Sequence, residues 1–119
     1  MKKVLNFGFA DAIPTMDLIE DGEIAVHPVT RASEAIVAHV RVIGLQSGDQ
    51  QTLTIKDSQG VLLSEYKAPA LDHDKAQYLI SAGRKRAGAT WSERNFVATY
   101  RVLKDGAEVL QKTFEVTLK

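Results

Sequence analysis

The chain has 119 residues, 45% of them hydrophobic and 25% charged, and its 15 basic residues balance its 15 acidic ones. A chain of this length forms one ordinary domain, so we expect a single domain over residues 1–119 with one core. The hydrophobic fraction is typical of a folded protein and unlike that of a disordered segment. Because the net charge is zero, no global field gathers phosphate backbones or an anionic membrane, and bulk nucleic-acid binding is disfavoured.

The chain contains no cysteine. This excludes disulfides, thiolate-zinc and iron–sulfur sites, and cysteine nucleophiles. Residues 1–12 resemble a signal peptide in their basic opening and small-x-small ending, but the apolar part is only about seven residues long and Asn6 interrupts it. We therefore interpret this segment as a strand. No stretch approaches the roughly twenty apolar residues of a membrane helix, so we expect no membrane insertion.

Apolar and polar residues alternate with a period of two through most of the chain, which predicts strands instead of helices. Residues 35–43 carry a clear pattern of this kind, and we expect a central strand there that ends at Gly44. The region before it is expected to hold a strand at residues 4–9, a loop around Pro14, a short strand at residues 23–26 and a break at Pro28.

A hairpin is predicted after a polar loop at residues 46–50. Its first arm alternates over residues 52–56. Its turn, residues 57–60, has an aspartate that can bond its own downstream backbone and a glycine that can close the reversal. The second arm, residues 61–66, stops before Pro69, which has no N–H to donate to a ladder.

Two interpretations are open for the next segment. Residues 76–81 alternate as a strand, whereas residues 71–76 would accept one helical turn capped by Asp72 or Asp74. A basic, glycine-containing connection is expected to follow at residues 83–90.

The last part of the chain is its most informative. Residues 91–119 predict a complete hairpin, because the Asp-Gly pair at residues 105–106 suits a two-residue turn between two alternating runs. The apolar faces of the two arms are Phe96, Ala98, Tyr100 and Val102, and then Leu110, Phe114, Val116 and Leu118.

Seven or eight short strands with turn signals about every ten residues predict an all-β sandwich or barrel. Residues 95–102 resemble the penultimate strand of an immunoglobulin-like or fibronectin type III-like β-sandwich, and residues 113–118 resemble the closing strand of many bacterial members. The resemblance implies an immunoglobulin-like antiparallel β-sandwich of about seven or eight strands, and it favours an extracellular or periplasmic location over a cytoplasmic one. It implies no single function, since this fold hosts many.

Metal-binding and catalytic groups are few. Only the aspartates of residues 72–74 could share a metal, because neighbouring side chains of an extended chain point to opposite sides, and two ligands do not make a site. The acidic residues at 20–23 lack the spacing of a calcium loop. The half-covered strand face around His39 indicates a surface or interface histidine instead of a catalytic base. The three histidines of the chain are His27, His39 and His73.

Enzyme motifs are missing as well. No serine lies in a nucleophile elbow, and no glycine pattern opens a helix after a strand. We therefore expect no enzyme activity, no catalytic residue, no metal site and no cofactor.

The one local concentration of charge is basic, at residues 84–86 with Arg94 a little later. Arginine offers a fork of donors that matches carboxylate and phosphate oxygens, although a solvated turn is the commoner explanation of such a cluster. Trp91 and Tyr78 are expected near it. An exposed Trp91 would form a stacking platform or a protein hot spot, whereas a buried one would plug one end of the sandwich. The candidate binding residues are Arg84, Lys85, Arg86, Trp91 and Arg94.

We therefore expect a non-catalytic module that recognises or assembles with another protein, as an accessory domain of a bacterial envelope or extracellular protein. The alternative is a carbohydrate- or metal-binding accessory domain. A further option is self-association through edge strands, for which the long closing strand at residues 109–118 would offer free backbone groups.

Overall fold

The computed structural model describes residues 2–10, 29–86, 88, 91 and 94–118. These residues form strands and no helix, which confirms the all-β prediction. The seven strands are β1 (Lys3–Ala10), β2 (Ala35–Leu45), β3 (Gln50–Asp57), β4 (Leu62–Lys67), β5 (Lys75–Lys85), β6 (Asn95–Lys104) and β7 (Ala107–Thr117).

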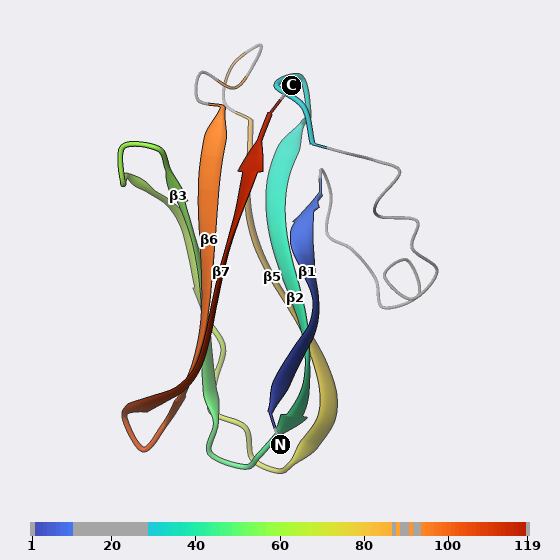
Figure 1. Cartoon of the computed structure of the whole chain (residues 1–119), viewed down its shortest axis with the longest axis vertical. Coiled ribbons are helices and arrows are strands. Elements are labelled where there is room, and N and C mark those ends of the chain that lie inside the picture. The colour runs from blue at the N-terminus through green and yellow to red at the C-terminus, as the bar shows by residue number, and fades with distance from the viewer. Residues whose placement is uncertain (1, 11–28, 87, 89–90, 92–93, 119) are drawn as a thin grey trace.

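The strands form two antiparallel sheets that pack face to face as two layers (Figure 1). One sheet has the order β1-β2-β5, and the other has the order β4-β3-β6-β7. Two sheets with one apolar face each bury those faces against one another. The predicted β-sandwich is therefore confirmed.

The core lies between the sheets and is built from alternate residues of their central strands. Tyr100 and Phe96 on β6 are the largest of the fully buried side chains. From the facing sheet, Val40 and Val42 on β2 are also fully buried and belong to the same cluster. Burying a large apolar side chain contributes about 1.5–3 kcal/mol, so this cluster is the main source of stability in a chain without disulfides.

The terminal hairpin forms as predicted. Asp105 and Gly106 adopt positive φ angles of 52° and 81°, which is the backbone that a tight two-residue reversal between twisted strands requires. The predicted apolar faces of both arms point into the core: Phe96, Ala98, Tyr100, Val102, Phe114 and Leu118 are buried, and Leu110 and Val116 pack against them.

The turn between β3 and β4 is also confirmed. One carboxylate oxygen of Asp57 accepts hydrogen bonds from the backbone N–H groups of Gln59 (2.9 Å) and Val61 (3.0 Å). Gly60 closes the reversal with a φ of 81°. The aspartate side chain thus replaces backbone partners that the turn leaves open.

One predicted strand end is wrong. Gly44 does not end β2, which continues to Leu45. Gly44 takes a φ of 76°, and the ladder with β5 resumes beyond it, where Leu45 pairs with Lys75. Leu45 is also buried in the core, so pairing and burial hold the strand together past its glycine.

The segment after β4 follows the strand interpretation, and the alternative of a helical turn at residues 71–76 is wrong. The strand is longer than expected. Gly83, Arg84 and Lys85 belong to β5, because they pair with residues 35–37 of β2. The basic residues at this point were expected in a connection, and they lie instead on the end of an edge strand.

Several expectations fall outside the described residues. These are the loop around Pro14, the strand at residues 23–26, the break at Pro28, His27 and the acidic group at residues 20–23. Within the part of the chain that the structure describes, no helix has the length and apolar character needed to cross a membrane.

Candidate functional site

The predicted basic residues gather at one end of the sandwich, which we call the basic end. Arg84 and Lys85 lie on the last residues of β5, and Arg94 directly precedes β6. The end of β5 and the start of β6 both lie at this end (Figure 1). All three side chains are exposed.

Trp91 lies inside the basic end and is buried, with 9% of its surface exposed. Its ring contacts Phe96 edge-on, with ring centroids 6.0 Å apart, and its indole N–H donates to the carbonyl of Ser33 at 2.9 Å. A buried tryptophan with a satisfied N–H is a core residue. Trp91 therefore plugs this end of the sandwich and offers no stacking platform.

Arg86 is half-buried and joins two segments of the chain. Its Nε donates to the carbonyl of Gly88 at 2.8 Å, and one terminal nitrogen donates to the carbonyls of Ala32 and Ser33. Its backbone N–H donates to the carbonyl of Glu34 at 2.7 Å. Of the predicted basic residues, Arg86 is the one whose donors are used inside the fold.

Arg84, Lys85 and Arg94 differ from Arg86. In the part of the chain that the structure describes, none of these three side chains takes part in a hydrogen bond or an ion pair. They leave positive charge at the rim of the end where Trp91 and Arg86 donate hydrogen bonds to the backbone of Ala32 and Ser33. Tyr78 does not belong to this group, because it pairs with Val42 toward the other end of β5.

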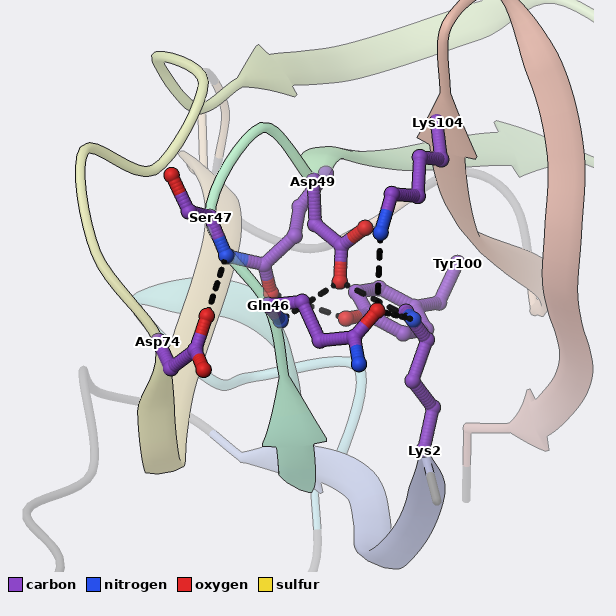
Figure 2. A network of polar contacts seen from close by, with 8 residues as sticks. Lys2, Gln46, Ser47, Asp49, Asp74, Tyr100 and Lys104 are labelled. Atoms are coloured by element: carbon purple, nitrogen blue, oxygen red, sulfur yellow. Dashed lines mark hydrogen bonds and ion pairs between the residues drawn. The ribbon is translucent and has the colours of Figure 1, made fainter.

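The opposite end of the sandwich carries a polar network around Asp49 (Figure 2). Asp49 is fully buried. One carboxylate oxygen accepts from the backbone N–H of Gln46 at 2.8 Å and pairs with the ammonium of Lys2 at 3.3 Å. The side-chain oxygen of Gln46 in turn accepts from Lys104 at 2.8 Å. These contacts tie the start of the chain, the β2–β3 loop and the end of β6 together.

Next to Asp49, the network enters the core. Tyr100 donates its hydroxyl proton to the side-chain oxygen of Gln51 at 2.8 Å. Burial, followed by the charge of Asp49, raises the pKa of Tyr100 above its ordinary value of 10.0. The other carboxylate oxygen of Asp49 and the amide nitrogen of Gln51 are buried with no hydrogen-bond partner in the part of the chain that the structure describes, which is a costly arrangement.

His39 is the third buried polar side chain, on the outer face of β2, with 2% of its surface exposed. Its ring lies against Gly8, where an added Cβ would come within 3.2 Å of Nε2. Within the described residues, neither ring nitrogen has a hydrogen-bond partner, and burial lowers the pKa of His39 below 6.5. The imidazole thus lies over a glycine and is buried in this chain, whereas the sequence predicted a surface or interface histidine on a half-covered strand face.

The acidic cluster at residues 72–74 does not converge. Asp72 hydrogen-bonds its neighbour His73, and this bond holds the pKa of Asp72 below its ordinary value of 3.8. Asp74 instead accepts from the backbone N–H of Ser47 at 2.8 Å. No group of three or more potential metal ligands occurs among the described residues.

A shallow groove of about 380 Å³ lies on the outer face of the four-stranded sheet. Its floor is polar, because the outward residues of β3 and β6 are threonines at the centre of the sheet. Thr54 pairs with Thr99, and Thr99 pairs with Thr113 on β7. The lining residues are Thr52, Thr54, Lys56, Gly60, Leu62, Glu65, Thr99 and Arg101.

Little in the sequence indicated the buried polar residues. Asp49 follows Gly48 in a loop that looks solvated, and Gln51 occupies an inward position of β3 that alternation assigns to an apolar residue. The one sequence signal was that Gln51 takes the same inward position in the alternation as Leu53 and Ile55.

Comparison of the chain with protein-family models, with curated proteins and with solved structures found no match in any of the three.

Proposed function

We propose that this chain is a non-catalytic, immunoglobulin-like β-sandwich module that binds another protein through its basic end. The observation that carries the proposal is the set of three exposed, unpaired cationic side chains, Arg84, Lys85 and Arg94, at the rim of that end. A partner that supplies carboxylates to these side chains gains charge-assisted hydrogen bonds.

The hydrogen bonds inside the basic end support a recognition role. Trp91 and Arg86 donate to backbone carbonyls of the segment that leads into β2. Groups that the fold already holds by hydrogen bonds lose less conformational entropy when a partner binds beside them. Recognition residues at the end of a rigid sandwich are the usual arrangement in such domains.

The strand order supports the immunoglobulin-like assignment. In the constant-type domain, the first, second, fifth and fourth strands form one sheet and the third, sixth and seventh form the other. The order here differs in the place of one strand, since β4 pairs with β3 and not with β5. The same resemblance supports a role as an accessory domain of an envelope or extracellular protein.

The test is binding of a labelled short polyglutamate peptide, measured by fluorescence anisotropy. Replacing Arg84, Lys85 and Arg94 with Ala should weaken binding at least about tenfold, because each charge-assisted bond contributes about 1.5–3 kcal/mol. The matched control replaces the exposed lysines Lys3, Lys56 and Lys67 with Ala and removes the same charge elsewhere. Equal losses in the two variants would mean unspecific attraction and would contradict the proposal.

A second candidate, a carbohydrate-binding domain, is favoured by the groove on the four-stranded sheet. Threonine hydroxyls flanked by Lys56, Glu65 and Arg101 present donors and acceptors suited to a hydroxylated ligand. A titration with neutral and acidic oligosaccharides, followed by amide chemical shifts, tests it. Shifts confined to the groove and abolished by Thr54→Val would establish this candidate, and flat titrations would remove it.

A further inference from the structure

The end of the sandwich that carries the polar network, which we call the Asp49 end, holds two unpaired polar atoms. They are the carboxylate oxygen Oδ1 of Asp49 and the amide nitrogen Nε2 of Gln51, and neither has a hydrogen-bond partner in the described part of the chain. Both residues are fully buried. The first atom is an acceptor and the second is a donor. Buried polar groups of folded proteins are paired with other protein groups or with ordered water, because an unpaired one costs free energy.

The side chains of Asp49 and Gln51 lie on the same side of the backbone. The carbonyls of both residues accept from the segment that follows β4, from the N–H groups of Leu71 (3.0 Å) and Ala68 (2.9 Å) respectively. Carbonyls and side chains both alternate along an extended chain, so residues whose carbonyls point the same way also share a side-chain face. Residues two apart are separated by about 6.6 Å, and one molecule with two hydrogen bonds joins atoms up to about 5.6 Å apart.

The chemistry of the two atoms decides which molecule fits between them. The hydroxyl of Tyr100 already bonds the amide oxygen of Gln51. The other carboxylate oxygen of Asp49 already bonds Lys2 and the backbone of Gln46. A cation would suit the free carboxylate oxygen but would repel the amide N–H, and an anion would do the reverse. A neutral molecule that both accepts and donates serves the two atoms at once, and the smallest such molecule is water.

We propose that one water molecule is bound between Asp49 and Gln51, where it accepts from Nε2 of Gln51 and donates to Oδ1 of Asp49. Its second proton is available to the hydroxyl oxygen of Tyr100, which can accept as well as donate. Burial and then the charge of Asp49 raise the pKa of Tyr100, so the carboxylate lies near that hydroxyl (Figure 2). Buried waters make about three hydrogen bonds, which is the number of partners that this site supplies.

The water explains a polar residue at an inward position of β3. Alternation assigns the place of Gln51 to an apolar side chain, as at Leu53. A glutamine there bonds Tyr100 with one end of its amide and the water with the other. This inference goes beyond the proposed function, because the water site lies at the opposite end of the sandwich from the basic residues.

Magnetic relaxation dispersion of the water oxygen nuclei tests the inference, because its amplitude counts long-lived buried waters. The hydroxyl of Tyr100 could hold the water in place of a missing amide, so the variants are made in Tyr100→Phe. Adding Gln51→Met keeps the side-chain length and removes the amide N–H. Adding Gln50→Met is the matched control, because it makes the same change at the exposed neighbouring residue.

We expect the variant with Gln51→Met to lose the amplitude of one water molecule relative to the control with Gln50→Met. The native chain and Tyr100→Phe alone should match the control, since both keep Asp49 and Gln51. Equal amplitudes in the two methionine variants would overturn the inference.

Nuclear Overhauser cross-peaks between water and side-chain amide protons give a second readout in the native chain, with no variant needed. A buried water stays long enough to give a cross-peak of the same sign as those within the protein, whereas surface water leaves too quickly. We expect such a cross-peak at Gln51 and none at the exposed Gln50. Its absence at Gln51 overturns the inference. Amide signals of Gln51 that shift with the alkali cation of the buffer would indicate a bound ion and overturn it as well.

The proposed function and this inference fail separately. The water measurements report on the Asp49 end and involve no partner, whereas the polyglutamate peptide reports on the basic end. A missing water leaves the binding test unchanged, and a failed binding test leaves the water site standing.

Discussion

The two ends of the sandwich use polar residues in opposite ways. At the basic end, the N–H groups of Trp91 and Arg86 donate to backbone carbonyls. The exposed charges of Arg84, Lys85 and Arg94 have no partner in the described structure. At the other end, the charge of Lys2 is paired with Asp49, and unsatisfied polar atoms lie inside. The difference shows that one end has charge available for an external partner, whereas the other uses its charge to close the core.

The largest expected effect is at the basic end. Trp91→Ala should lower the free energy of unfolding by about 3–5 kcal/mol, because it removes a large buried ring and its contact with Phe96. Urea denaturation measures this. A loss below about 1 kcal/mol would mean that Trp91 is a surface residue and does not close the basic end.

The next effect is at the opposite end. Asp49→Ala should cost about 2 kcal/mol, because the backbone N–H of Gln46 and the ammonium of Lys2 lose their shared acceptor. Denaturation of Asp49→Ala, Lys2→Ala and the double variant in one cycle separates the ion pair from the turn. Additive losses would show that Lys2 and Asp49 do not act together.

The pH dependence of stability tests the burial of Tyr100 at the opposite end. The unfolded chain releases the hydroxyl proton of Tyr100 near its ordinary pKa of 10.0, whereas burial keeps the proton on the folded chain. Above pH 10 the unfolded state therefore binds fewer protons, and stability falls as pH rises. The stability of Tyr100→Phe, which keeps the ring but has no hydroxyl proton to lose, should fall less steeply over the same pH range. Parallel curves for the two proteins would contradict a buried, protonated Tyr100.

The smallest effects separate neighbouring basic residues. Arg84→Ala and Lys85→Ala should each change stability by less than about 0.5 kcal/mol, as exposed substitutions do. Arg86→Ala should cost about 1–2 kcal/mol, because its donors hold Ala32, Ser33 and Gly88. Thermal unfolding of the three variants measures these differences in stability. Equal losses would mean that the hydrogen bonds of Arg86 do not stabilise the fold.

The sequence predicted what depends on local periodicity and turn chemistry. The alternation over residues 96–102 and the Asp-Gly turn correctly defined the last hairpin, and Asp57 correctly marked the turn before β4. The assignment of residues 83–85 to a connection failed because their strand state comes from pairing with β2, which lies far away in sequence.

The same limit applies to the candidate site. The sequence correctly identified the concentration of basic residues, but it could not separate Arg86 and Trp91, which the fold uses, from Arg84, Lys85 and Arg94, which it leaves exposed. That separation depends on carbonyls of residues 32–34, about fifty residues away in the chain. The place of the His39 ring likewise involves Gly8 in the neighbouring strand, where an added Cβ would crowd the imidazole.

One measurement tests the contrast between the ends most directly: backbone amide chemical shifts of the native chain during titration with the polyglutamate peptide. We expect saturable shifts at Arg84, Lys85 and Arg94 and unchanged positions at Gln46, Asp49 and Lys104, whose side chains are already engaged with one another or with Lys2. Shifts centred on the Asp49 end, or spread evenly over all exposed lysines, would contradict the assignment of recognition to the basic end.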